Sequence, residues 1–161
     1  MSFFLSFTVK DDVLFERVSE KLINGGVIGW FQGKMEFGPR ALGNRSILAS
    51  PLFEDMKTHV NLNIKFREGF RPFAPIVLEE DSHDWFDMEK TPSKYMLFTV
   101  KSDKKEQIPS CIHEDDTARV QTLNSEENPL LHLLIQSFKE KTDCPVLINT
   151  SFNVRGEPIV E

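Results

Sequence analysis

Cysteine is scarce in this chain of 161 residues, which contains only Cys111 and Cys144. The two lie far apart and form no CxxC pair, which excludes the usual thiolate zinc motifs and is typical of proteins from a reducing compartment. The four histidines are scattered and make no metal-binding pattern. No apolar run is long enough to cross a membrane as a helix. These absences predict a soluble domain without a metal site of its own.

An excess of positive charge is also missing, because the formal net charge is -6. General nucleic-acid binders are usually basic, since neutralising phosphates supplies much of their affinity. Two nucleotide-binding patterns, GxxxxGK[ST] and GxGxxG, are absent as well. The first residues, MSFFLSFTV, lack the basic region and the cleavage site of a signal peptide, so we expect a cytoplasmic location. Locally basic pockets remain compatible with this charge balance.

Apolar periodicity predicts helices and strands that interleave along a single domain. Expected helices cover 13–23, 53–64 and 129–141, the last with Asn128 as its cap and Pro129 in its first turn. Expected strands cover 27–31, 46–50, 76–78, 95–100, 118–123 and 145–148, with a charged loop over 101–116. The strand at 27–31 is apolar and bounded by glycines, so we expect a buried strand with Trp30 and Phe31 in the core; the alternative for these two side chains is an adenine platform. This order indicates an α/β or α+β fold.

The arginines are distributed unevenly. Six of the seven fall in four short segments, GPRALGNRS, KFREGFRPF, TARVQ and FNVRGEP. The guanidinium group is a planar fork of donors that matches phosphate or carboxylate oxygens, and neighbouring glycines let the backbone approach a ligand. One cation–phosphate contact at ~4 Å is worth roughly 4 kcal/mol at an effective dielectric of about 20. The pattern favours a polyanionic ligand; the alternative is that each arginine pairs separately with one of the 25 acidic residues.

The segment NTSFNVRG, residues 149–156, follows a predicted strand and supplies amide, hydroxyl and guanidinium donors. Ligands of α/β sheets commonly bind at the carboxyl ends of strands. Asn149, Thr150, Ser151 and Asn153 are therefore candidate ligand contacts. The alternative is an Asx or Ser turn that only closes the strand. No base stands beside Ser151 in the sequence, so we do not expect a covalent serine nucleophile.

Four longer motifs resemble one known family. GWFQGKMEFGPRALGNRSILASP, VNLNIKFREGFRPFAP, DDTARVQT and PVLINTSFNVRGEPIV occur in this order, and they resemble the C-terminal domain of the NodU/CmcH carbamoyltransferase family over residues 25–161. The resemblance implies a YrdC-like fold, a twisted mixed sheet flanked by helices. The Lys-x-Arg and Ser-x-Asn pairs of YrdC-like enzymes match Lys65 with Arg67, and Ser151 with Asn153.

The resemblance also implies a reaction. The domain would form carbamoyl-adenylate from carbamoyl phosphate and ATP, with Mg²⁺ held through the nucleotide. The implied catalytic residues are Arg40, Lys65, Arg67, Arg119, Ser151 and Asn153. Residues implied in nucleotide or phosphate binding are Arg45, Arg71, Asn149, Thr150 and Arg155. For Arg45, bracing its own loop is the alternative.

In this family a separate N-terminal domain of actin-like ATPase fold, which carries a metal, passes the carbamoyl group to a hydroxyl of a small-molecule acceptor. The resemblance therefore implies an O-carbamoyltransferase. Residues 1–161 are expected to be a fragment that lacks this domain and a further C-terminal segment. Phe3, Phe4 and Phe7 are candidates either for the core or for contact with the N-terminal domain.

Asp116 departs from the family pattern, which often has glycine before TARVQ, and an acid pointing inward there would weaken anion binding. His113, just before this motif, either lines the site or is an ordinary loop residue. Two other functions stay open: a module that binds nucleotide or RNA, and a non-catalytic docking domain.

Overall fold

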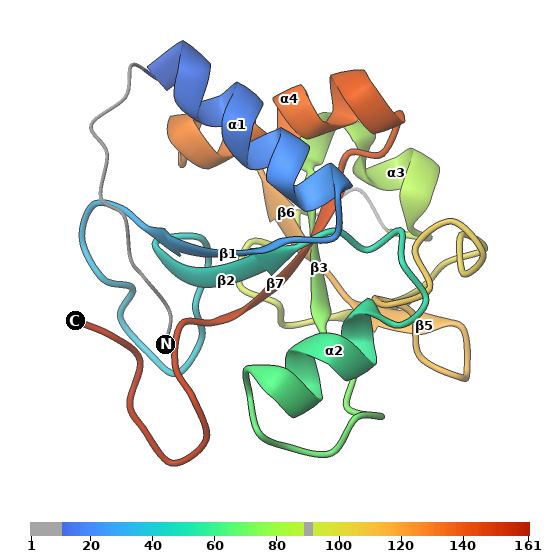
Figure 1. The fold of residues 1–161 in the computed structure, drawn as a ribbon. Helices are drawn as coiled ribbons and strands as arrows, with labels where there is room; N and C mark the ends of the chain where they lie inside the picture. Colours follow the sequence, from blue (N-terminus) through green and yellow to red (C-terminus); the bar gives the residue numbers. More distant parts are fainter. Residues whose placement is uncertain (1–10, 89–91) are drawn as a thin grey trace.

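A five-stranded mixed sheet forms the centre of the molecule, for which a computed structural model describes residues 11–88 and 92–161 (Figure 1). The segment MSFFLSFTV, with Phe3, Phe4 and Phe7, lies outside the described residues. Neighbouring strands run antiparallel except for one parallel pair, β3 with β6. In spatial order the strands are β1 (Val27–Phe31), β2 (Arg45–Ala49), β7 (Val146–Ser151), β3 (Ala74–Leu78) and β6 (Gln121–Leu123).

Helices cover both faces of this sheet. Figure 1 shows α1 (Asp11–Ile23) and α4 (Pro129–Thr142) packed together above the sheet, with α2 (Met56–Asn63) below it. Their apolar sides are fully buried at Leu22, Val60, Leu134 and Phe138. A 3₁₀ turn, η1 (Glu79–Asp81), and the short α3 (Ser82–Trp85) follow β3. The predicted α+β fold, a mixed sheet flanked by helices, is confirmed.

Helix α4 forms where the sequence predicts it, with its predicted cap. The Asn128 side chain accepts a hydrogen bond from the Leu131 amide, and Pro129 occupies the first turn, where its missing N–H costs nothing. Asp143 ends the helix in a left-handed conformation, with φ 58°.

The stretch 118–123, predicted as one strand, is divided between two sheets. β5 (Thr117–Arg119) pairs with β4 (Thr99–Lys101) in a small two-stranded sheet, whereas β6 pairs with β3. Arg119 is exposed, but Val120 to Leu123 are all buried, so a half-buried pattern changes to a fully buried one within the stretch. The apolar pattern contains no sign of this change of partner.

Three other predicted elements differ in extent or burial. The strand expected at 95–100 is reduced to Thr99–Lys101, because Met96 has a left-handed φ of 55° that an extended strand does not allow. The helix expected from residue 53 begins at Met56, after a turn. β1 is an edge strand rather than a buried one: Trp30 is buried as predicted, but Phe31 is 54% exposed, so its predicted place in the core is wrong.

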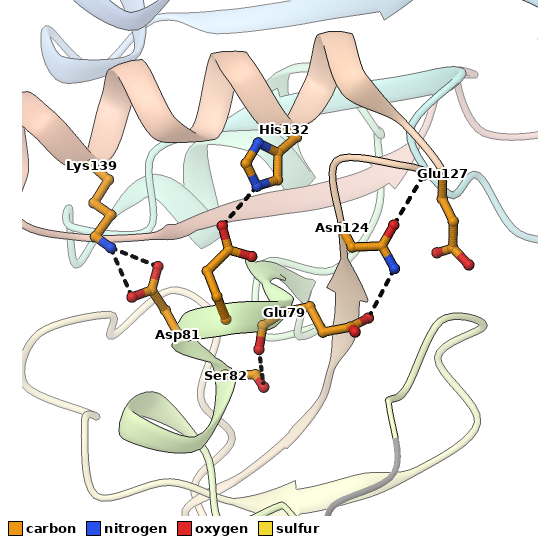
Figure 2. Close-up of polar contacts among 8 residues, drawn as sticks. Glu79, Asp81, Ser82, Asn124, Glu127, His132 and Lys139 are labelled. Atoms are coloured by element: carbon orange, nitrogen blue, oxygen red, sulfur yellow. Dashed lines mark hydrogen bonds and ion pairs between the residues drawn. The ribbon is translucent and has the colours of Figure 1, made fainter.

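Ion pairs fasten η1 to α4. Figure 2 shows the Lys139 ammonium beside the Asp81 carboxylate. Lys139 Nζ donates to both oxygens of this carboxylate, at 2.7 and 2.8 Å. His132 Nε2 lies 2.7 Å from Glu80 Oε1. His132 and Lys139 therefore attach α4 to η1, the turn that follows β3.

Replacing Glu80 by glutamine tests this attachment. Burial opposes ionisation of Glu80, but hydrogen bonds from its main-chain N–H and from His132 outweigh it, so the pKa of Glu80 is lowered. A lowered carboxyl pKa stabilises the fold above the unfolded pKa, and this stabilisation is lost as pH falls through the folded pKa. We expect Glu80→Gln to reduce the free energy of unfolding by about 0.5 kcal/mol at about pH 6, and the difference to vanish in acid.

Urea unfolding at several pH values measures this effect. The matched control is Glu140→Gln, an exposed glutamate of α4, for which we expect no change. An effect of Glu80→Gln that stayed constant down to about pH 3 would contradict the ion-pair explanation.

Candidate functional site

Basic residues from four separate segments meet around two adjoining cavities at the end of β7. The cavities share Arg67 and Ser151, and among the described residues that line them Glu68 is the one acid. Five of the seven arginines line them, so the convergence on which the predicted ligand depends is present. One cavity, of about 240 Å³, is lined by Lys65, Arg67, Glu68, Arg71, Ser151 and residues 153–156. The other, of about 320 Å³, is lined by residues 39–41, Arg67, residues 72–74, Met96, His113, Arg119 and residues 149–151.

Lys65 is a buried cation that faces neutral oxygens. It is 6% exposed, and its ammonium lies 2.8 Å from Ser151 O, 3.2 Å from Ser151 Oγ, 2.9 Å from Asn153 O and 2.7 Å from Asn153 Oδ1. Ser151 Oγ donates in turn to Asn153 Oδ1, at 2.6 Å. Burial, and then the charge of Arg67, lower the pKa of Lys65 to about 8. The two predicted pairs, Lys-x-Arg and Ser-x-Asn, thus form one hydrogen-bonded group.

Arg67 is held in place by Asn61, a residue that the sequence analysis did not single out. Arg67 Nε donates to Asn61 Oδ1 at 2.6 Å, and the guanidinium lies over the Phe73 ring at 5.0 Å from its centroid. The Asn61 amide donates to the carbonyls of Gly69 and Arg71, so one fully buried side chain also fixes the loop after Arg67. Burial and the neighbouring Arg71 lower the pKa of Arg67, against the opposite effect of Glu68.

A strained turn separates Lys65 from Arg67. Phe66 has a left-handed φ of 49°, which is uncommon for an aromatic residue, and its side chain is exposed. The turn lets Lys65 point to β7 while Arg67 reaches both cavities.

The outer parts of the two cavities are more exposed. Arg71 forms an ion pair with Glu68 at 3.1 Å, and Arg155 lines the same cavity. Arg40 and Arg119 are exposed residues of the other cavity, which His113 and Thr150 also line. His113 therefore lines the cavity, which was one of its two predicted places.

Two predicted phosphate ligands point their donors at the protein itself. Arg45 is 5% exposed, lines neither cavity, and donates through Nη1 to the carbonyls of Gln32, Gly33 and Asn44. Phe31 covers its guanidinium at 3.5 Å. These contacts match the alternative in which Arg45 braces its loop. The Asn149 amide is likewise occupied, since it donates to Ala41 O and to Gln121 Oε1.

Asp116 does not point into the site. Its carboxylate is exposed and lies 2.9 Å from the Lys105 ammonium. Its φ of 61° is left-handed, a conformation in which glycine would be unstrained. The acid at this position therefore leaves the charge of the cavities unchanged.

The contrast between Arg45 and Arg119 can be tested by the same substitution. Arg45→Met should lower the free energy of unfolding by about 2–3 kcal/mol, because three carbonyls lose a buried charged donor. Arg119→Met should change it by less than about 0.5 kcal/mol but weaken the binding of a polyanion, for which ATP serves as the probe. Urea unfolding and calorimetric titration measure the two effects. Equal losses of stability in both variants would contradict the division of roles.

The affinity for anions should depend on the protonation of Lys65. A bound phosphate favours the charged ammonium, so we expect ATP affinity to be constant below about pH 8 and to fall by up to tenfold per pH unit above it. Calorimetric titration between about pH 6.5 and 9.5 measures this. Lys65→Met should bind weakly at every pH and show no such slope. A slope that persisted in Lys65→Met would assign the titration to another group.

Two further properties bear on the kind of protein. Among residues 11–88 and 92–161, no group of three or more His, Cys, Asp or Glu side chains could hold a metal ion. In the same part of the chain, no helix is both long and apolar enough to cross a membrane.

Known proteins share both the sequence and the fold. An uncharacterized protein of Synechocystis sp. is 46% identical over 93% of this chain and 28% of its own length. Nodulation protein NolNO of Sinorhizobium fredii is 44% identical over 94% of this chain and 23% of its own. Nodulation protein U of Rhizobium tropici is 46% identical over 77% and 22%. The chain therefore spans about a quarter of the length of the curated relatives that it matches.

The fold is also found in a solved structure. HypF of T. kodakarensis superposes with a TM-score of 0.58 at 15% identity, over 91% of this chain and 18% of that chain. At this identity the likeness concerns the fold alone. The family model described as Carbamoyltransferase C-terminus matches residues 19–161. The family predicted from the four motifs is thus confirmed: this chain belongs to the carbamoyltransferase C-terminal family.

Proposed function

We propose that this chain forms carbamoyl-adenylate from carbamoyl phosphate and ATP. The observation that carries the proposal is the meeting of Lys65 and five arginines around two adjoining cavities that contain a single carboxylate. Both substrates are polyanions, and they can be brought together only where fixed positive charge offsets their repulsion. Membership of the carbamoyltransferase family supports the carbamoyl group as the group transferred.

The proposed reaction consumes one water and can be written as two balanced steps. In the first, carbamoyl phosphate loses inorganic phosphate to water, which leaves carbamate. A carbamate oxygen then attacks the α-phosphorus of ATP, the bond from that phosphorus to the bridging oxygen breaks, and pyrophosphate leaves with the electron pair. Negative charge accumulates on the departing phosphate and pyrophosphate, so donors aimed at these groups lower both barriers.

The cavities suggest how the residues divide this work. Arg40, Arg67 and Arg119 would bind the phosphate oxygens in the 320 Å³ cavity. Lys65, Ser151 and Asn153 would orient the reacting group where the cavities adjoin, and Arg71 and Arg155 would bind at the outer edge of the 240 Å³ cavity. Holding two reactants in line can contribute roughly 7–11 kcal/mol to the rate, so orientation is the largest task of this group.

The lining residues fit nucleotide phosphates better than a metal held by the protein. They offer guanidinium and ammonium donors, and the one acid, Glu68, is already paired with Arg71. Mg²⁺ would therefore arrive on ATP, and it would neutralise part of the phosphate charge there.

The curated relatives are longer, and this chain spans about a quarter of their length, so we place the later half of the reaction outside this chain. In our proposal, a separate domain of actin-like fold, which carries a metal, passes the carbamoyl group to a hydroxyl of a small-molecule acceptor in the cytoplasm. This would make the complete protein an O-carbamoyltransferase.

A docking function has one observation in its favour. Phe37 is fully exposed and Met35 is 41% exposed on the loop that also carries Arg40. Apolar side chains in such positions often mark a contact with another protein surface. Docking and catalysis differ in one outcome: a docking domain would release no pyrophosphate.

Release of pyrophosphate tests the proposed reaction. With ATP, Mg²⁺ and carbamoyl phosphate, the chain should release pyrophosphate, and with acetyl phosphate in place of carbamoyl phosphate it should not. Lys65→Ala should slow the release at least about 100-fold, since it removes the central charged donor. The matched control is Lys57→Ala, a lysine of α2 outside the two cavities, which should be unaffected. A wild-type chain that bound both substrates and released no pyrophosphate would contradict the proposal.

A further inference from the structure

Two buried amide side chains hold the loop that carries Arg40. Gln121 of β6 and Asn149 of β7 are each 2% exposed. Gln121 Nε2 donates to Leu42 O at 2.8 Å, and Asn149 Nδ2 donates to Ala41 O at 3.1 Å and to Gln121 Oε1 at 2.7 Å. We call Gln121 and Asn149 the amide clamp. It holds two consecutive carbonyls, directly after Arg40 in the chain.

The register of the sheet places both amides on one face. On β3, Ala74 is the partner of Asn149, and Ile76 is the partner of Gln121. Residues two apart on a strand point to the same face, and so do their directly paired partners. The clamp therefore crosses β3 and joins two strands that are not neighbours.

The direction of each amide is determined by its partners. The carbonyls of Ala41 and Leu42 can only accept, so the NH₂ groups of Asn149 and Gln121 must face the loop. This leaves the oxygen of Gln121 to accept from Asn149. A carboxylate at position 121 would place an acceptor against the Leu42 carbonyl, so the clamp requires an amide there.

The loop needs such support because its charge and its backbone both favour movement. Arg40 lies between Gly38 and Gly43, which have φ of 120° and 118°, and it faces the like charges of Arg67 and Arg119 across one cavity. Glu36 restrains the loop from within, since its Oε1 accepts from the amides of Leu42 and Asn44. Only the amide clamp joins residues 41 and 42 to β6 and β7 among the described hydrogen bonds.

We propose that Gln121 is a positioning residue, which acts through the Ala41–Leu42 segment to keep Arg40 directed at the anion in the cavity. This inference deepens the proposed function, since it rests on the same site. It also implies that Asn149 holds the cavity wall in place through Ala41 and is not itself a phosphate ligand.

A double-mutant cycle with inorganic pyrophosphate as the probe tests this proposal. Gln121→Met removes the amide while nearly keeping the side-chain volume, and Arg40→Ala removes the cation. We expect each to weaken pyrophosphate binding roughly fivefold, as for the loss of one charged contact. If Gln121 acts through Arg40, then Gln121→Met in the Arg40→Ala background should change the affinity by less than about twofold.

The control is Thr122→Val, a nearly isosteric change of the neighbouring buried residue, whose hydroxyl has no hydrogen-bond partner. It should leave the affinity unchanged. Gln121→Asn keeps an amide that is one methylene too short, and it gives the same cycle with less disturbance if Gln121→Met does not fold. Losses that simply add, or an Arg40→Ala variant that binds as wild type, would overturn the proposal. Because the cycle measures only binding, a failure of carbamoyl-dependent pyrophosphate release would count against the reaction and not against the clamp.

Discussion

The site depends on a lysine ammonium that is buried against neutral oxygens. A buried cation usually has a carboxylate beside it, because desolvation is otherwise poorly offset. Lys65 instead points to carbonyl, hydroxyl and amide oxygens of Ser151 and Asn153, and Arg67 adds a second positive charge nearby. The fold therefore contains a positive potential that is incompletely neutralised, and an anion bound there would complete the neutralisation.

The surrounding structure maintains this potential by replacing acids with amides and carbonyls. Asn61 holds Arg67, and the carbonyls of Gln32, Gly33 and Asn44 hold Arg45. Neutral partners fix the direction of a guanidinium without cancelling its charge. Asp116 pairs with Lys105 outside the cavities, and Glu68, which lines one cavity, is paired with Arg71. Segregation of this kind lets a protein with a net charge of -6 keep a strongly basic site.

Much of the fold was predictable because local signals were strong. Helix α4 has an apolar stripe, an asparagine cap and a proline in its first turn, and each signal depends only on neighbours in sequence. The division of 117–123 between two sheets was not predictable, since it depends on which strands lie alongside. The same limit explains Phe31: its apolar run indicates a strand, but only the sheet order makes that strand an edge.

For the site, the motifs indicated which cations matter but not which side chains orient them. Asn61 and Gln121 stand within two of the four motifs, but their helix and strand patterns do not distinguish them from exposed polar residues. Their roles follow from the hydrogen bonds that they make in the folded chain. Gln121 donates to the carbonyl of Leu42, 79 positions away, and Asn61 donates to carbonyls of the loop that follows its own helix. The catalytic and binding roles of the motif residues stay predictions until they are measured.

The pairing of β4 with β5 has a consequence for how proteins of this kind can diverge. Residues 102–116 leave the small sheet at Lys101 and return to it at Thr117, and these two residues are directly paired. A loop closed at its base can gain or lose residues at small entropic cost and without moving the strands that it joins. Arg119 would keep its place while the segment that includes His113 changed in length and composition. Evolution could in this way remodel one wall of the cavity independently of the cations that define it.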